Sequence, residues 1–192
     1  KHVTRINEYQ SYSGEENVFR MMAYIRKYLF EDPTAPIPLE PIKMPFDGIY
    51  SLVNNQVYYD ISSFLEAQDK KFDIYVGMLS HRSSWLNQNL QVESSLIEAL
   101  NQINIGVIPV FSSGEKSEIV QSYDFEEIVE HYFSINGQLF IQGLINFQMH
   151  LIKAQNGLSI AENSVRLFQK IDIPVFHPIS SYFTDLAKWK EN

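Results

Sequence analysis

Apolar residues from residue 73 onward follow two alternating patterns. Short apolar runs, typical of strands covered on both faces of a sheet, occupy 74–79, 105–111, 139–145 and 171–176. Apolar side chains at helical spacing occupy the segments between them, over 90–100, 124–131 and 159–170. This alternation predicts parallel strands joined by right-handed crossovers. The expected fold class is therefore α/β, doubly wound, with a flavodoxin-like or Rossmann-like parallel sheet.

The first 67 residues follow a different pattern. Helical spacing over 16–30 places one apolar stripe along a predicted helix, formed by Val18, Met21, Met22, Ile25 and Leu29. Five prolines between residues 32 and 45 each fix φ and remove a backbone donor, which predicts an extended connector. A short helix over 59–67, capped by Asp60, should follow. We expect residues 1–45 to be the end of a preceding domain plus a proline-rich linker, and residues 46–192 to be the α/β domain.

Composition narrows the class of function. Fifteen basic against 23 acidic residues give a formal charge of −8, which argues against nucleic-acid binding. The absence of cysteine excludes disulfides and thiolate metal sites. No apolar run reaches the roughly 20 residues of a membrane helix, and no export signal is visible, so we expect a cytoplasmic protein. The chain starts at Lys1 and ends in a helical pattern over 187–192, which suggests a piece of a longer protein.

Sequence motifs for the common nucleotide and hydrolase sites are missing. The first predicted strand is not followed by Gly-x-Gly-x-x-Gly, and no P-loop motif occurs in the chain. A Gly-x-Ser-x-Gly elbow and a His-Glu-x-x-His pair are also missing. The candidate chemistry must therefore come from the positions of single residues.

Polar residues follow each predicted strand. Parallel strands bring their carboxyl ends to one edge of the sheet, where ligands usually bind. The residues expected at this edge are Ser80, His81, Arg82, Ser83, Trp85, Ser112, Ser113, Asn146 and His177. One hypothesis is a pocket for an anionic or polar ligand, with Arg82 as carboxylate clamp and His81 and His177 as proton carriers or metal ligands. The other is that these residues merely end the strands, and two histidines alone are too few for a zinc site.

The segment 73–111 resembles a known family. It is similar to the cobaltochelatase large subunit (CobN) and the related magnesium chelatase H subunit. The residues that carry the resemblance are Arg82, Ser83, Trp85, Leu86, Leu96, Ile97, Glu98, Ala99, Leu100, Gly106, Val107, Pro109, Val110 and Phe111. Further similarity lies in 33–36, 47–50 and 171–176, and in Trp189. His81 stands where the family more often has tyrosine, and residues 112–138 follow no family pattern.

The resemblance implies a very large subunit that binds a tetrapyrrole and inserts Co²⁺ or Mg²⁺ together with ATPase chelatase subunits. The histidine- and glutamate-bearing motifs for metal insertion would lie outside these 192 residues. The chain would then be an N-terminal, non-catalytic portion that has no cofactor of its own. The parent complex would use ATP, Mg²⁺, Co²⁺ and a tetrapyrrole, and the partners would be the remainder of the large subunit and the ATPase subunits. Two alternatives stay open: a stand-alone flavodoxin-like module for a small ligand, and an enzyme that uses His81 and His177.

Overall fold

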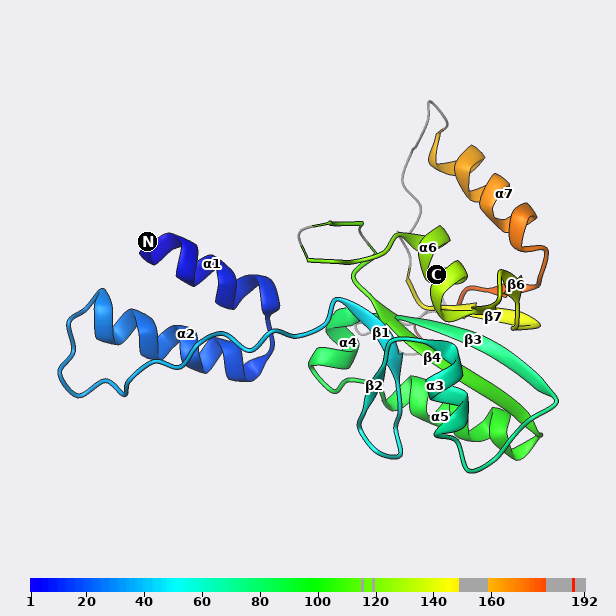
Figure 1. The fold of residues 1–192 in the computed structure, drawn as a ribbon, viewed down its shortest axis with the longest axis horizontal. Helices are drawn as coiled ribbons and strands as arrows, with labels where there is room; N and C mark the ends of the chain where they lie inside the picture. The colour runs from blue at the N-terminus through cyan, green and yellow to red at the C-terminus, as the bar shows by residue number, and fades with distance from the viewer. Residues whose placement is uncertain (115, 119, 149–158, 179–187, 189–192) are drawn as a thin grey trace.

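The central feature of the computed structural model is a six-stranded mixed sheet (Figure 1). The structure describes residues 1–114, 116–118, 120–148, 159–178 and 188. The strands, in the spatial order β2-β1-β4-β3-β7-β8, are β2 (Val57–Tyr58), β1 (Asp47–Tyr50), β4 (Ile105–Ser112), β3 (Ile74–His81), β7 (Gly143–Asn146) and β8 (Val175–Phe176). Strands β4, β3, β7 and β8 are parallel, which confirms the α/β prediction.

Helices cover both faces of this sheet. On one face, α3 (Ile61–Glu66), α6 (Phe125–Tyr132) and α7 (Ile160–Ile171) enclose the larger core, in which Leu79, Ile108 and Leu144 are fully buried. On the other face, α5 (Gln91–Gln102) packs over a smaller core centred on Met78. Within the described part of the chain, no helix is both long and apolar enough to cross a membrane.

Helix starts follow the capping chemistry in the sequence. The Asp60 carboxylate accepts a hydrogen bond from the Ser63 amide (2.8 Å), as expected for the cap of α3. Asp124 and Glu127 form a reciprocal capping box at the start of α6. These side chains satisfy amides that the first helical turn leaves unpaired, so the predicted helix starts are correct to within two residues.

Two predicted strands have the wrong extent. The run 139–145 is divided: β6 (Gln138–Leu139) pairs with β5 (Ser134–Ile135) in a hairpin, and β7 begins only at Gly143. The hairpin turns at Asn136 and Gly137, which both have positive φ, as a tight turn requires. The run 171–176 is shorter than expected because α7 continues to Ile171 and ends at Asp172 in the left-handed conformation (φ 48°).

The antiparallel edge of the sheet was not predicted. Strand β1 runs antiparallel to β4, and β2 runs antiparallel to β1. Both strands are too short to show periodicity in the sequence. Gly48 permits their close approach, since a Cβ atom there would lie 2.6 Å from the side chain of Val57.

The N-terminal extension is a helical hairpin beside the sheet, with helices α1 (His2–Tyr12) and α2 (Glu15–Tyr28) (Figure 1). The sequence analysis did not predict α1. The linker then returns to β1 without a helix or strand over 32–45, as the prolines predicted. Asn17 fixes the linker to α2: its amide group both donates to the Ile42 carbonyl (2.9 Å) and accepts from the Ile42 amide (2.8 Å). The expected two-domain division at residue 45 stays a prediction. Of the helical pattern at 187–192, only residue 188 is among the described residues, so Trp189 lies outside them.

Candidate functional site

The parallel strands have their carboxyl ends at the same edge of the sheet. The strand order reverses between β3 and β7, and ligands of open α/β sheets usually bind beside such a point. The side chain of Gln148, which follows β7, lies over the ends of β3 and β4, where it donates to the carbonyls of Ser80 (2.6 Å) and Ser112 (3.0 Å). The Gln148 amide donates to the Asn146 side chain (2.9 Å). Ser80, Ser112 and Asn146 are therefore together, as predicted, but they are buried beneath a glutamine that the sequence analysis did not consider. In the sequence, the only indication of Gln148 was that a polar residue lies two positions after the end of a strand.

His81 and Ser83 lie exposed above this buried layer. His81 precedes α4 (Arg82–Leu86), and its Nδ1 accepts from the Ser83 amide (3.2 Å) and lies 2.7 Å from the Ser83 hydroxyl. Because Nδ1 is an acceptor, a neutral His81 ring must carry its proton on Nε2. This exposed ring therefore has one N–H donor available for a ligand.

Arg82 points toward the helical hairpin and the linker. The residue is 7% exposed, and its guanidinium donates to the carbonyls of Pro45 (2.7 Å), Tyr12 (2.8 Å) and Met44 (3.3 Å). The Phe46 ring lies 4.2 Å from the guanidinium carbon. Burial lowers the pKa of Arg82 to about 10, which still leaves it charged at neutral pH. Arg82 was predicted to bind a ligand carboxylate, but its N–H donors already bind carbonyls of the linker and of the end of α1.

Trp85 and His177 are also separated from the predicted group. The Trp85 ring stacks on Phe111, with 3.9 Å between centroids and 3° between planes, so one of its faces is covered. His177 follows β8 and contacts Phe168, with β7 between its strand and that of His81. Among the described residues, no three metal-binding side chains are grouped to hold an ion. Ligand binding by the residues predicted at this edge stays a prediction.

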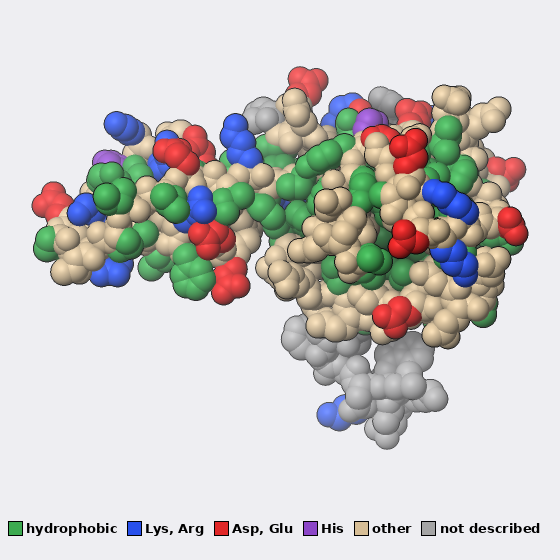
Figure 2. Space-filling model, turned by 60° about the horizontal axis from the view of Figure 1, so that its bottom comes forward, with side chains coloured by type: hydrophobic (Ala, Val, Ile, Leu, Met, Phe, Trp, Pro, Cys, Tyr) green, Lys and Arg blue, Asp and Glu red, His purple; other side chains and the backbone are tan. Residues whose placement is uncertain are grey.

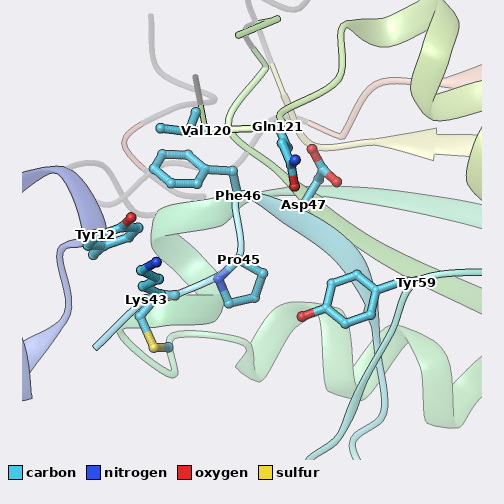
Figure 3. A pocket seen from close by; sticks show the side chains of 9 residues that line it. Tyr12, Lys43, Pro45, Phe46, Asp47, Tyr59, Val120 and Gln121 are labelled. Carbon is cyan, nitrogen blue, oxygen red and sulfur yellow. The ribbon is translucent and has the colours of Figure 1, made fainter. Parts of the chain in front are cut away.

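A cleft of about 480 Å³ opens where the hairpin and linker meet the sheet (Figure 3). Its lining consists of Tyr12, Lys43, Met44, Pro45, Phe46, Asp47, Tyr59, Val120 and Gln121. Asp47 pairs with Ser112 across the sheet, which places the cleft at the carboxyl end of β4. The backbone around the Arg82 guanidinium forms part of the wall. This size is within the range of small-molecule sites.

The charged groups of the cleft have different roles. Asp47 is buried, and its carboxylate accepts from the Tyr132 hydroxyl (2.6 Å) and from the Tyr123 amide (2.9 Å). Burial raises the pKa of Asp47, although these two hydrogen bonds oppose the increase. The side chain of Lys43 is exposed and is the cation among the lining residues.

Three aromatic side chains are part of the lining. Tyr12, Phe46 and Tyr59 surround the cleft, and Tyr59 is 58% exposed (Figure 3). Aromatic faces beside a cation suit a flat molecule that carries an acidic group. Lys43 was not predicted as a site residue because it lies among the linker prolines, far along the chain from the end of any predicted strand.

Comparisons with known proteins agree with the sequence resemblance. The CobN/magnesium chelatase family model matches residues 7–192. Two uncharacterized proteins of Methanocaldococcus jannaschii, MJ1441 and MJ0908, are 30% identical over 185 residues and 24% identical over 181 residues. They align with 95% and 92% of this chain.

The alignments also show a difference in length. This chain spans 14% of each of the two relatives. The catalytic subunit of cobaltochelatase from Mycobacterium tuberculosis matches 92% of this chain at 13% identity and a TM-score of 0.49, over 13% of its own length. Since the family model covers nearly all of the sequence, the chain belongs to the CobN/magnesium chelatase family.

Proposed function

We propose that this chain is a non-catalytic, N-terminal portion of a tetrapyrrole metal chelatase large subunit. The intact subunit would insert Co²⁺ or Mg²⁺ into a tetrapyrrole in the cytoplasm, together with ATP-hydrolysing partner subunits. Membership of the family supports the tetrapyrrole as substrate. The role of this portion would be to bind one side of the macrocycle and position it for the rest of the subunit.

The observation that carries this proposal is the aromatic cleft with Lys43 at the carboxyl end of β4. A tetrapyrrole is flat and bears carboxylates at its rim. The rings of Tyr12, Phe46 and Tyr59 would contact its face, and the Lys43 ammonium would pair with a carboxylate. The exposed Nε2–H of His81 would give a second polar contact along the same edge.

The same residues support a non-catalytic role. Metal insertion requires groups that accept protons from the ring nitrogens and deliver the ion. Both oxygens of Asp47 already accept hydrogen bonds from Tyr123 and Tyr132. The proposal therefore assigns metal insertion to the remainder of the subunit.

A binding titration tests this function. The purified chain is titrated with a carboxylated porphyrin and a carboxylated corrin, followed by tryptophan fluorescence and by the absorbance of the ligand. We expect Lys43→Gln to weaken binding by about threefold, as for an exposed ion pair. Lys70→Gln is the matched control, because Lys70 precedes β3 at the opposite edge of the sheet.

Two results would contradict the proposal. Failure of both ligands to bind, or equal effects of the two lysine variants, would remove the cleft as a tetrapyrrole site. Unaided metal insertion by the isolated chain would disprove the non-catalytic role.

A flavodoxin-like module for a small ligand is the second candidate. The order β4-β3-β7-β8 is that of the first four strands of a flavodoxin-like sheet, which favours it. In such folds the ligand binds at the switch point, and here the buried Gln148 side chain lies beside it, over the ends of β3 and β4. Flavin that copurifies with the chain, and is lost in a variant that enlarges Gln148, would support this candidate over the chelatase role.

A further inference from the structure

The outward face of α2 carries apolar side chains that contact little of the described structure. At about 100° per residue, Asn17 and Tyr24 lie on one side of the helix, buried against α1 and the linker. The residues that point in the opposite direction are Val18, Phe19 and Met22, with Leu29 at the C-cap, and we call these four the outer stripe. Their exposed fractions are 50%, 62%, 50% and 47%, in that order.

The exposed residues are ones that the sequence pattern predicted to be buried. Val18, Met22 and Leu29 belong to the stripe whose helical spacing predicted a buried face. An apolar sector about 100° wide is typical of a helix that packs on another surface. Instead, α2 packs against α1 and the linker through its opposite side, where Asn17 binds Ile42. The helix therefore has two packing faces, of which one is covered.

The space-filling view shows the same distribution on the surface. Hydrophobic side chains gather on the outside of the helical lobe, between charged ones (Figure 2). Phe30, which is 76% exposed, extends the outer stripe beyond the helix. Contiguous exposed apolar patches are uncommon on monomeric proteins and mark sites of interaction.

The helical hairpin and its linker together carry no net charge. Residues 1–46 contain six basic and six acidic residues, although the chain as a whole has a formal charge of −8. Arg5 and Arg26 of the hairpin pair with Glu40 and Asp32 of the linker. Recognition of a partner would therefore depend on the apolar side chains of the outer stripe and not on charge.

We propose that the outer stripe docks onto an apolar surface of another part of the same large-subunit polypeptide. The inference rests on the proposed function, which supplies the larger subunit. The relatives support this occupant, because the chain spans 14% of their length and the rest of such a subunit offers ample surface.

Cysteine labelling tests the location of the partner. The chain has no cysteine, so Met22→Cys introduces one thiol into the outer stripe. Gln10→Cys on exposed α1 is the matched control. Alkylation by iodoacetamide is followed by peptide mass spectrometry in the isolated chain and in the intact large subunit. Because alkylation follows thiol exposure, we expect Met22→Cys to react about tenfold more slowly in the intact subunit and Gln10→Cys to keep its rate.

Three results would overturn the inference. Equal Met22→Cys rates in the two proteins would leave the outer stripe uncovered. Protection that appears in the isolated chain as its concentration rises would assign the surface to a second copy. Protection that requires added ATPase subunits would assign it to a different chain.

Substitutions at Phe19 test the apolar contact. Phe19→Asp and Phe19→Lys both replace the ring by a charge, whereas Phe19→Leu keeps an apolar side chain. In the intact subunit we expect either charge to speed proteolysis of the 29–46 linker several-fold relative to Phe19→Leu. In the isolated chain the three variants should match, and equal rates of the three in the intact subunit would contradict an apolar partner surface. A chain that binds no tetrapyrrole but still shows Met22→Cys protection would disprove the proposed site and leave the docking surface intact.

Discussion

The sheet and the helical extension are stabilised by different kinds of interaction. In the sheet, Met78, Leu79 and Ile108 have no exposed surface, and both cores are apolar. In residues 1–46, the buried apolar side chains are Tyr9, Tyr24 and Ala35. The extension is instead joined to its linker and to the sheet by directed hydrogen bonds from Tyr9, Asn17 and Arg82.

Because of this difference, the stability of the sheet and the position of the extension depend on different interactions. Burial of apolar surface is proportional to area and not directional, so the sheet should tolerate conservative changes in shape. Hydrogen bonds depend on geometry, so the placement of α1 and of the cleft wall depends on a few polar side chains, of which Arg82 donates to three carbonyls. The candidate site is therefore lined in part by a region that directed hydrogen bonds hold, and not by the apolar core.

The largest expected effect comes from the core of the sheet. Ile108→Ala should lower the free energy of unfolding by about 2–5 kcal/mol, because it leaves a cavity at a fully buried position of β4. Met22→Ala in the outer stripe should change it by less than about 0.5 kcal/mol. Urea denaturation of the isolated chain measures both values. Similar losses for the two variants would show that the extension has a core of its own.

The next effect concerns the attachment of the extension. Arg82→Met should cost about 1–3 kcal/mol, since it leaves the buried carbonyls of Tyr12, Met44 and Pro45 without their donor. Hydrogen exchange should speed up in residues 2–46 and stay unchanged in β3 and β4. Arg26→Met, which removes an exposed arginine paired with Asp32, is the control and should leave exchange near the cleft unaffected. Uniformly faster exchange across the sheet would mean that Arg82 stabilises the whole fold and does not act locally.

The sequence predicted the sheet far better than the site, for a physical reason. The strands β3 and β4 are continuous apolar runs, and the caps Asp60 and Asp124 are local signals, so both could be identified without tertiary contacts. Strand β1 pairs with β4 across about sixty residues of chain and has no periodicity of its own. The direction of a side chain such as Arg82 depends on the same distant contacts.

The cleft shows the same limit. Tyr12, Lys43 and Tyr59 come from an unpredicted helix, a linker and the segment after a two-residue strand. No spacing in the sequence connects them. The strand-end rule indicated the edge of the sheet at which the cleft opens, but most of the residues it selected are buried or point elsewhere, although His81 and Ser83 lie exposed there.

A smaller expected effect is the pH dependence of the unfolding free energy, which should differ between the two regions. Burial raises the pKa of Asp47 above 3.8, so the folded state holds this proton more tightly than the unfolded state. The stability that Asp47 contributes should therefore be complete below about pH 3.8 and be lost as the pH rises through the higher folded-state value. Relative to Asp47→Asn, the wild-type chain should lose stability across this range. A difference in unfolding free energy that is constant with pH would contradict the burial of this carboxylate.

The smallest effect is the opposite behaviour of an aspartate in the extension. Hydrogen bonds from Thr34 and Arg26 lower the pKa of the exposed Asp32 to about 2. Its contribution to stability should be present above the unfolded value of 3.8 and be lost as the pH falls toward 2. A carboxyl NMR titration of the wild-type chain should show Asp32 titrating below 3.8 and Asp47 above it. Arg26→Met should move the Asp32 midpoint toward 3.8 and leave that of Asp47 unchanged. If both aspartates titrated on the same side of 3.8, the contrast between a solvated, hydrogen-bonded extension and a buried sheet would fail at the level of single groups.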